Sequence, residues 1–203
     1  HHGLQDSGCQ VIDIGQVPSP VLYFATKHLQ YHSGVMLTAS HNPSNYNGLK
    51  IVLAGKSLSG DAIDALYRRV QAGGFVSEEK GSYQQLSVTE AYLNQITQII
   101  SLARPLRVVL DCGNGVGAVV APELLRRLGC EVIELFCEVD GHFPNHHPDP
   151  SVPENLNDLI ACVKEHQADI GLALDGDGDR LGVVTNHGEI IWPDRQMLSL
   201  IHI

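Results

Sequence analysis

The sequence predicts an α/β protein built from two successive α/β units. Short apolar or alternating runs of strand length recur along the 203 residues, and amphipathic segments of helix length separate them. Gly and Pro mark many of the boundaries. In the second half, strands alternate with helices, which favours a parallel sheet because parallel strands need long crossover connections.

The expected elements of the first unit are short. In chain order they are a strand at 10–14, a helix at 19–29, strands at 35–37 and 49–53, and a helix from Asp61 to Gly73-Gly74. Ser19 followed by Pro20 predicts a cap and a first helical turn. A polar, turn-rich loop at 38–48 separates the two later strands.

A polar, glycine-containing stretch at 73–86 predicts the approach to a linker. Ser87 and Glu90 predict a capping box for a helix that continues to about residue 101. Pro105 marks the second unit. Its expected elements are a strand at 106–110, a turn at 111–117, a helix at 118–128, a strand at 131–136, an irregular loop at 137–153, a helix at 154–166, a strand at 170–174, a hairpin at 181–184 and 189–192, and a helix from 193.

Composition excludes several functional classes. The formal net charge is -10 and there is no Lys/Arg run, so we expect no nucleic-acid partner. No apolar run reaches membrane-spanning length, so we expect no membrane partner and a cytoplasmic location. The five cysteines are odd in number, widely spaced and without a C-x-x-C pair, which predicts small buried side chains in a reducing compartment.

Both ends of the sequence are abrupt. His1–Leu4 starts without Met and without a helix cap, and residues 197–203 are apolar without a helix stop signal. We therefore expect the chain to be a piece of a longer protein.

The strongest chemical motif follows the apolar run 170–174. Asp175, Asp177 and Asp179 alternate with two glycines. Like charges at ~4 Å cost roughly 1 kcal/mol in water, and a hard divalent cation removes that penalty. Three carboxylates leave open positions in the coordination shell, as Mg²⁺ sites do when a substrate phosphate completes them. This regular spacing favours a magnesium site over a solvated acidic turn.

A calcium-binding EF-hand loop is a specific alternative for the same residues. It requires Gly at the sixth position and Glu at the twelfth, counted from the first aspartate. Those positions hold Arg180 and Asn186, so the alternative fails at both. Arg180 instead places a cation beside the carboxylates, which suits an anionic ligand.

A second candidate site is the loop 38–48. Ser40 follows a short apolar strand, and its hydroxyl is a candidate nucleophile or phosphate carrier. His41 and Lys50 are candidates for proton transfer or for holding a phosphate. Taken alone, a Ser-His pair in a polar turn is most often only a turn.

A third pattern is a lenient dinucleotide-binding motif. Gly113, Gly115 and Ala118 follow a predicted strand, and Glu134 or Glu138 would then contact a ribose. A tight turn between strand and helix explains these glycines more simply.

Two of these loops resemble one known family. Residues 38–43 (TASHNP) resemble the phosphoserine loop of the α-D-phosphohexomutase superfamily, and residues 175–180 (DGDGDR) resemble its metal loop. Further segments are most similar to the bacterial phosphomannomutase/phosphoglucomutase branch of that superfamily. These segments are 34–37, 45–48, 108–115 and 138–150. The resemblance covers nearly the whole chain.

The resemblance implies tandem related α/β domains with mixed, mostly parallel sheets. Family members have four domains, of which the first three are related. Residues 1–84 would be part of domain I, residues 85–187 domain II, and residues 188–203 the beginning of domain III. The resemblance also reinterprets residues 113–117 as a turn within domain II.

Residue roles follow from the same resemblance. Ser40 matches the phosphoserine, whose oxygen is expected as a further metal ligand, and His41 matches the histidine after it. Lys50 matches a lysine proposed for proton transfer, and Arg180 an arginine near the phosphoserine. The Mg²⁺ ligands correspond to Asp175, Asp177 and Asp179.

The implied activity is interconversion of hexose 1-phosphate and hexose 6-phosphate, of mannose, glucose or both. A hexose 1,6-bisphosphate would be its intermediate and activator, and the full-length enzyme would be a monomer. The family's sugar-selecting and phosphate-gripping loops have no counterpart here, so we expect this chain alone to turn over poorly. The open alternatives are a metal-dependent sugar-phosphate phosphatase, a non-catalytic sugar-phosphate binding module and a nucleotide-binding oxidoreductase.

Overall fold

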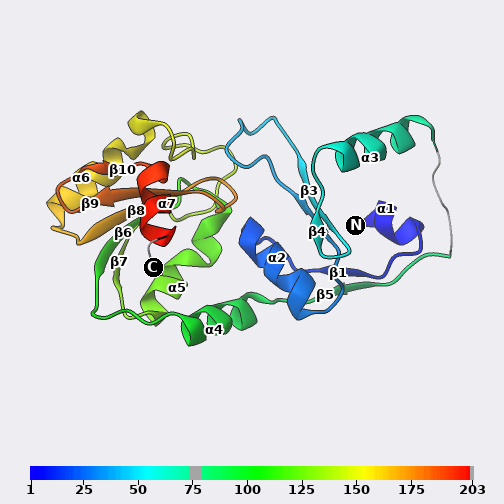
Figure 1. Cartoon of the computed structure of the whole chain (residues 1–203), viewed down its shortest axis with the longest axis horizontal. Coiled ribbons are helices and arrows are strands. Elements are labelled where there is room, and N and C mark those ends of the chain that lie inside the picture. Colours follow the sequence, from blue (N-terminus) through cyan, green and yellow to red (C-terminus); the bar gives the residue numbers. More distant parts are fainter. Residues whose placement is uncertain (74–78, 202–203) are drawn as a thin grey trace.

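The computed structural model describes residues 1–73 and 79–201, arranged as two units connected by one helix (Figure 1). The first unit contains α1 (His2–Asp6), β1 (Val11–Asp13), α2 (Ser19–His28), β2 (Gly34–Leu37), β3 (Leu49–Leu53), β4 (Lys56–Ser57), α3 (Asp61–Gln71) and β5 (Tyr83–Gln85). The connecting helix is α4 (Thr89–Ile99). The second unit contains β6 (Arg107–Asp111), η1 (Val116–Val119), α5 (Ala121–Arg127), β7 (Glu131–Leu135), η2 (Pro153–Leu156), α6 (Asn157–Glu165), β8 (Ile170–Leu174), β9 (Leu181–Thr185), β10 (Ile190–Ile191) and α7 (Pro193–Ile201).

The second unit is built on a five-stranded sheet with the order β10-β9-β8-β6-β7. Strands β7, β6 and β8 are parallel, and β9 and β10 continue the sheet in the antiparallel sense. The run Val108-Val109-Leu110 in β6 is almost fully buried, as expected for a central parallel strand covered on both faces. Leu159 and Val163 of α6 pack against this sheet, so the predicted α/β class is confirmed.

The first unit contains two smaller sheets. Strands β2, β3 and β4 form an antiparallel sheet, whereas β1 pairs in parallel with β5. Across the described residues, three strand pairings are parallel and four are antiparallel. The sheets are mixed, as expected. The proportion of parallel pairings is smaller than expected, because the strand pairings of the first unit are mostly antiparallel.

Strand β5 lies inside the stretch that was expected to be linker. Its side chains are all exposed, so the sequence carries no alternation that would mark it. Its hydrogen bonds with β1 return the chain to the first unit before α4 begins. Residues 74–78 belong to the expected helix end at Gly73-Gly74 and to the expected linker at 73–86. They lie outside the described residues.

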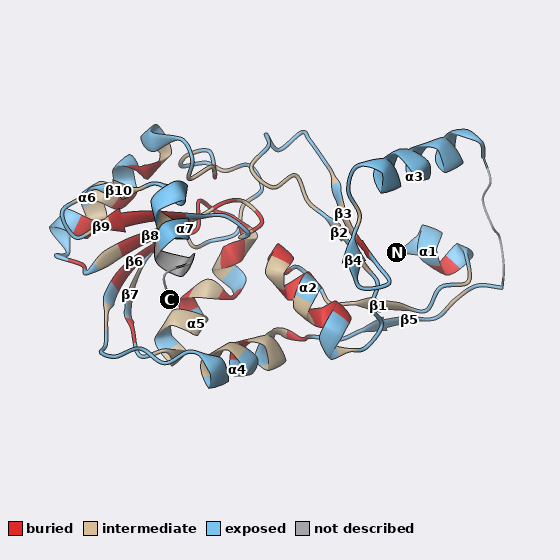
Figure 2. Ribbon diagram, in the orientation of Figure 1, coloured by how far each residue is buried: buried red, intermediate tan, exposed pale blue. Residues whose placement is uncertain are grey.

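A hydrophobic core shared by α2, α4 and α5 holds the two units together. Val21 and Ala25 of α2 pack in one cluster with Leu93 of α4 and with Val120, just before α5. Figure 2 shows buried positions on α2 where it approaches the second unit. Full burial of one such side chain contributes about 2 kcal/mol. This core positions the loops of the first unit against the second.

The predicted capping box at Ser87 is wrong. Helix α4 has Val88 at its N-cap, and no side-chain cap is formed. Glu90 instead accepts a hydrogen bond from Arg127 of α5. A tertiary ion pair therefore replaces the local cap, and the helix ends at Ile99 rather than near residue 101.

Two other helices begin later than expected. The segment expected to start at residue 118 is a 3₁₀ turn, and α5 starts only at Ala121 because Pro122 has no N–H and suits only a first helical turn. The helix expected from residue 154 likewise opens with a 3₁₀ turn at Pro153 before α6.

The cysteines partly match their expected environment. All five are free; Cys112 and Cys130 are buried and Cys137 and Cys162 are half-buried. Cys9 is exposed, which contradicts the expectation that all five are buried. No helix among the described residues is both long and apolar enough to cross a membrane.

Candidate active site

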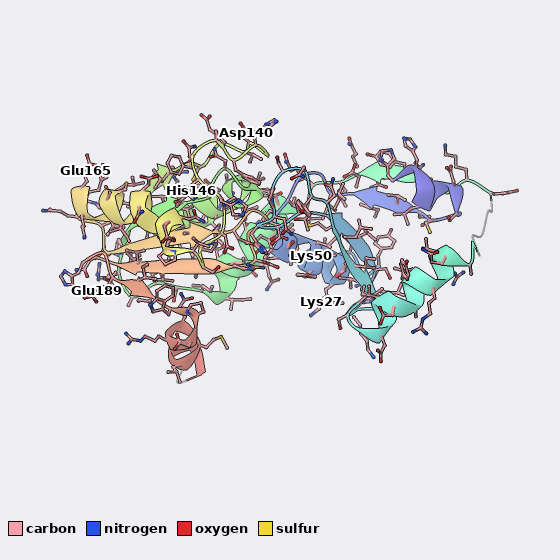
Figure 3. The ribbon with its side chains drawn as sticks, turned by 90° about the horizontal axis from the view of Figure 1, so that it is seen from above. Lys27, Lys50, Asp140, His146, Glu165 and Glu189 are labelled. Carbon is pink, nitrogen blue, oxygen red and sulfur yellow. The ribbon has the colours of Figure 1, made fainter. Side chains whose placement is uncertain are left out.

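The serine loop (residues 38–48) and the aspartate loop (residues 175–180) meet where the two units face each other. The serine loop connects the antiparallel strands β2 and β3, and the aspartate loop leaves the carboxyl end of the parallel strand β8. The carboxyl ends of parallel strands are the usual position of ligand sites in α/β sheets. Figure 3 labels Lys50, from β3, at this junction.

Ser40 is joined directly to the first aspartate. Its Oγ donates a hydrogen bond of 2.8 Å to Asp175 Oδ2. The other oxygen, Oδ1, accepts the backbone N–H groups of Asp179 and Arg180 at 2.9 and 3.0 Å. Asp175 is fully buried, so these donors fix its carboxylate with one oxygen turned toward Ser40.

The second and third aspartates share one ammonium group. Lys50 Nζ contacts Asp177 Oδ2 and lies 2.5 Å from Asp179 Oδ2. Ser19 Oγ donates a hydrogen bond of 2.6 Å to the same oxygen of Asp177. The other oxygen of Asp177, Oδ1, is buried and has no hydrogen-bond partner among residues 1–73 and 79–201.

Glycine allows the two loops to approach this closely. A Cβ on Gly176 would lie 2.2 Å from the carbonyl oxygen of Ser40, which no real side chain tolerates. A Cβ on Gly115 would lie 2.8 Å from the carbonyl oxygen of Gly176. Gly115 of the dinucleotide-like pattern therefore accommodates the aspartate loop, whereas Gly113 has a positive φ and a Cβ there would meet Pro148.

Ser40 itself has a left-handed backbone with φ of 53°. This conformation is uncommon for a residue with a side chain and occurs often at functional sites. The Ser40 N–H donates to Thr38 Oγ1 at 2.9 Å, which stabilises the turn. His41 Nδ1 lies 3.3 Å from Ser40 Oγ.

The protonation tendencies of the aspartates differ. Burial, together with repulsion from Asp177 and Asp179, raises the pKa of Asp175. Burial would also raise the pKa of Asp177, but hydrogen bonds from Lys50 and Ser19 outweigh it, and the pKa of Asp177 is lowered. The three aspartates therefore carry more negative charge than the single ammonium of Lys50 neutralises.

These residues fit a divalent cation. Each of the three aspartates offers an oxygen, and the three oxygens lie within 4.8 Å of one another. The orphaned Oδ1 of Asp177 is a buried acceptor that a cation would satisfy. An all-oxygen donor set is the type that Mg²⁺ prefers.

Lys50 holds its proton in this arrangement. Burial would lower the pKa of its ammonium, but the hydrogen bonds and ion pairs with Asp177 and Asp179 raise it above the ordinary value. The lowered pKa that would suit a proton-accepting lysine is therefore not found while both aspartates contact it.

Arg180 lies beside the same cluster. Its Nε is 3.9 Å from Asp175 Oδ2, the oxygen that accepts from Ser40. Its Nη1 is 3.9 Å from Asp149 Oδ1, in the loop that follows β7. The guanidinium is about half exposed and so remains accessible to an anionic ligand.

The fold thus brings together every residue singled out from the sequence for this site, namely Ser40, His41, Lys50, Asp175, Asp177, Asp179 and Arg180. Two further residues were missed. Ser19 was interpreted only as a helix cap, although it is the first residue of α2, after an N-cap at Pro18. Asp149 lies in a Pro-rich loop in which its polar side chain gave no distinguishing signal.

A half-buried histidine stabilises that loop. His146 Nε2 lies 2.9 Å from Asp111 Oδ2, and its Nδ1 lies 3.0 Å from the carbonyl oxygen of His147. Both partners are acceptors, so both ring nitrogens are best satisfied as N–H donors of the charged imidazolium. The hydrogen bond to Asp111 raises the pKa of His146 against the opposing effect of burial.

We expect the contribution of His146 to depend on pH. A pKa raised by folding adds stability that is complete below the unfolded value, about 6.5, and disappears as pH rises through the folded value. Replacing His146 with Gln should therefore lower the free energy of unfolding by about 2 kcal/mol at acidic pH and by less at alkaline pH. Urea unfolding at several pH values measures this. His142→Gln is the control, since that ring is 89% exposed and should have little effect.

The fold and the site together define a protein of tandem α/β units in which the serine loop contacts a loop of three aspartates that could hold a metal ion. Two family models match the chain. The model described as phosphoglucomutase/phosphomannomutase, alpha/beta/alpha domain I matches residues 1–77, and the corresponding domain II model matches residues 90–188. The chain belongs to the phosphoglucomutase/phosphomannomutase family.

Known proteins agree with this assignment. The chain is 58% identical over 196 residues to a phosphomannomutase/phosphoglucomutase of Pseudomonas aeruginosa, and 54% identical over 197 residues to a phosphoglucomutase of Neisseria gonorrhoeae. Each match covers 97% of this chain but only 42% and 43% of the relatives' own lengths. A crystal structure of a phosphoglucomutase/phosphomannomutase family protein from Burkholderia thailandensis superimposes with a TM-score of 0.90 at 47% identity, covering 98% of this chain and 45% of that one.

Proposed function

We propose that this chain carries the phosphoryl-transfer centre of an enzyme that interconverts hexose 1-phosphates and hexose 6-phosphates of glucose, mannose or both. The observation that carries the proposal is the hydrogen bond from Ser40 Oγ to Asp175 Oδ2. It joins a candidate phosphate carrier to a candidate metal ligand across the two units. The relatives named for these activities are more than twice as long, so further residues outside this chain would complete the substrate site.

In the proposed reaction, Ser40 carries a phosphoryl group on Oγ. The free hydroxyl oxygen of a hexose monophosphate forms a bond to phosphorus, and the bond from Ser40 Oγ to phosphorus breaks. The hydroxyl proton ends on Ser40 Oγ. The resulting hexose 1,6-bisphosphate reorients and returns its other phosphate to Ser40, so that the isomeric monophosphate is released.

The residues around Ser40 have distinct proposed roles. In the return step Ser40 Oγ loses its proton and the sugar oxygen that leaves phosphorus gains one. Lys50 is proposed to relay this proton, so that its ammonium beside Asp177 and Asp179 is protonated before and after each turnover. Arg180 holds phosphate oxygens, and His41 orients the Ser40 hydroxyl. Asp175, Asp177 and Asp179 would hold Mg²⁺, together with an oxygen of the phosphoserine. When bound, the cation stabilises charge on the transferring group.

A product assay separates the mutase from the open alternatives. The complete gene product is incubated with glucose 1-phosphate and Mg²⁺, with and without a trace of glucose 1,6-bisphosphate. We expect glucose 6-phosphate to form faster with the bisphosphate, with no matching release of inorganic phosphate. Release of inorganic phosphate without any bisphosphate requirement would identify a phosphatase instead, and binding without turnover a non-catalytic module.

We expect Mg²⁺ to stabilise the fold through the three aspartates. Saturation at about ten times the dissociation constant adds about 1.4 kcal/mol to the free energy of unfolding. Asp177→Asn removes one of the two charges paired with Lys50 and should abolish the Mg²⁺-dependent rise in unfolding temperature. Asp64→Asn, on the exposed face of α3, is the control and should leave the rise intact. An unchanged rise in Asp177→Asn would contradict the assignment.

The remaining expectations are part of the same proposal. The domain boundaries expected at residues 84/85 and 187/188, with residues 188–203 opening a third domain, stay a prediction for the complete protein. In this chain β5 runs to Gln85 and pairs with β1, and β10 pairs with β9, so both strands belong to the sheets of the units that precede these boundaries. The activity belongs in a reducing cytoplasm, which suits five free thiols, and the complete enzyme acts as a monomer.

A further inference from the structure

Ser19 connects three parts of the candidate active site. It is the first residue of α2 and is fully buried. Its backbone N–H donates to the carbonyl oxygen of Asp177 at 2.9 Å, and its Oγ donates to Asp177 Oδ2 at 2.6 Å. The same Oγ accepts a hydrogen bond from Lys50 Nζ at 3.2 Å. One side chain of the first unit thus contacts both an aspartate of the second unit and the lysine of β3.

The hydroxyl hydrogen of Ser19 has one strong acceptor. Asp177 Oδ2 and the sulfur of Met36, at 3.2 Å, are both within reach. A carboxylate is a much better acceptor than a thioether, so the hydrogen points to Asp177. With this donor and Lys50 both on Oδ2, the two oxygens of Asp177 are not equivalent, because Oδ1 is buried without a partner in the described part of the chain.

We propose that Ser19 is a positioning residue for phosphoryl transfer, one that ties down Oδ2 of Asp177 so that Oδ1 is presented to the cation. This inference rests on the proposed function and deepens it. The carboxylate of Asp175 is oriented in a similar way. Backbone N–H groups donate to its Oδ1, and its Oδ2 faces Ser40. The donors to Oδ1 of Asp175 come from the aspartate loop itself, whereas both donors to Oδ2 of Asp177, Ser19 and Lys50, come from the other unit.

Loss of the Ser19 hydroxyl should weaken cation binding. Asp177 Oδ2 would keep only Lys50, whose flexible stem does not fix the orientation of the carboxylate. Removing a group that orients a metal ligand typically costs 10–100-fold in metal affinity. We therefore expect Ser19→Ala to raise the dissociation constant for Mn²⁺, a spectroscopic substitute for Mg²⁺, by about 10–100-fold.

The test is a Mn²⁺ titration of the full chain followed by electron paramagnetic resonance, which needs no substrate and no turnover. Thr26→Val is the matched control, because it removes another buried hydroxyl of α2, one that bonds only to the carbonyl oxygen of Tyr23. Thermal unfolding without metal checks that the folds of both variants persist. Should Ser19→Ala fail to fold, Ser19→Cys, which retains the size but donates weakly, takes its place.

The expected result is weakened Mn²⁺ binding in the Ser19 variant and parental binding in Thr26→Val. Binding within twofold of the parent in the Ser19 variant would overturn the proposal, as would equal weakening in Thr26→Val. These outcomes are distinguishable from failure of the proposed function, which would appear as absence of phosphate transfer in the unchanged protein.

Discussion

Ser40→Ala should reduce mutase turnover of the complete gene product by about a thousandfold or more. Loss of a covalent nucleophile removes the phosphate carrier itself, and effects of this size are typical for such residues. The fold should be little affected, because Ser40 is only half-buried and its loop is held by the bond from its N–H to Thr38 Oγ1, which alanine keeps. The measurement is the rate of glucose 6-phosphate formation from glucose 1-phosphate.

The same loop provides the control. Ser44 is exposed and lies four residues further along, so Ser44→Ala should retain parental turnover. If Ser40→Ala turned over as fast as Ser44→Ala, Ser40 would not be the phosphate carrier.

Gly176→Ala should separate the two loops. The added Cβ would lie 2.2 Å from the Ser40 carbonyl oxygen and 3.1 Å from its carbonyl carbon, and neither backbone atom can rotate away as a side-chain tip would. The loops must therefore move apart by about 1 Å, and a misplacement of that size at an active site costs about a hundredfold in rate. We expect a loss of turnover on that scale while the core of the second unit stays folded.

Gly141→Ala is the corresponding control. A Cβ at Gly141 meets nothing within 4 Å, so the substitution should change neither turnover nor unfolding temperature. Parental turnover in Gly176→Ala would show that the close approach of Ser40 and the aspartate loop is not needed for phosphoryl transfer.

The parts of the site that are contiguous in sequence could be predicted from it. Asp175, Asp177 and Asp179 form a motif by themselves, and the apolar run of β8 indicated what lies before them. Ser40 was only a weak candidate from its position, since a serine in a polar turn has many ordinary explanations, and the resemblance of its loop to a family loop strengthened it.

The parts that depend on tertiary structure could not be predicted. Ser19 has the local signal of a helix start, and its contact with Asp177 spans 158 positions in the sequence. Glu90 likewise has the signal of a capping box, but its partner is Arg127 of another helix. Strand β5 is exposed throughout and is defined only by pairing with β1. In each case a distant contact overrides or supplies what local propensity does not encode.

The central claim is that Ser40 accepts a phosphoryl group beside the three aspartates. Incubation of the complete gene product with glucose 1,6-bisphosphate and Mg²⁺, followed by intact mass spectrometry and peptide mapping, tests it most directly. We expect one phosphoryl group per molecule, located on Ser40 and absent when Mg²⁺ is chelated. No phosphoryl group, or one on an aspartate that persists in Ser40→Ala, would contradict the claim.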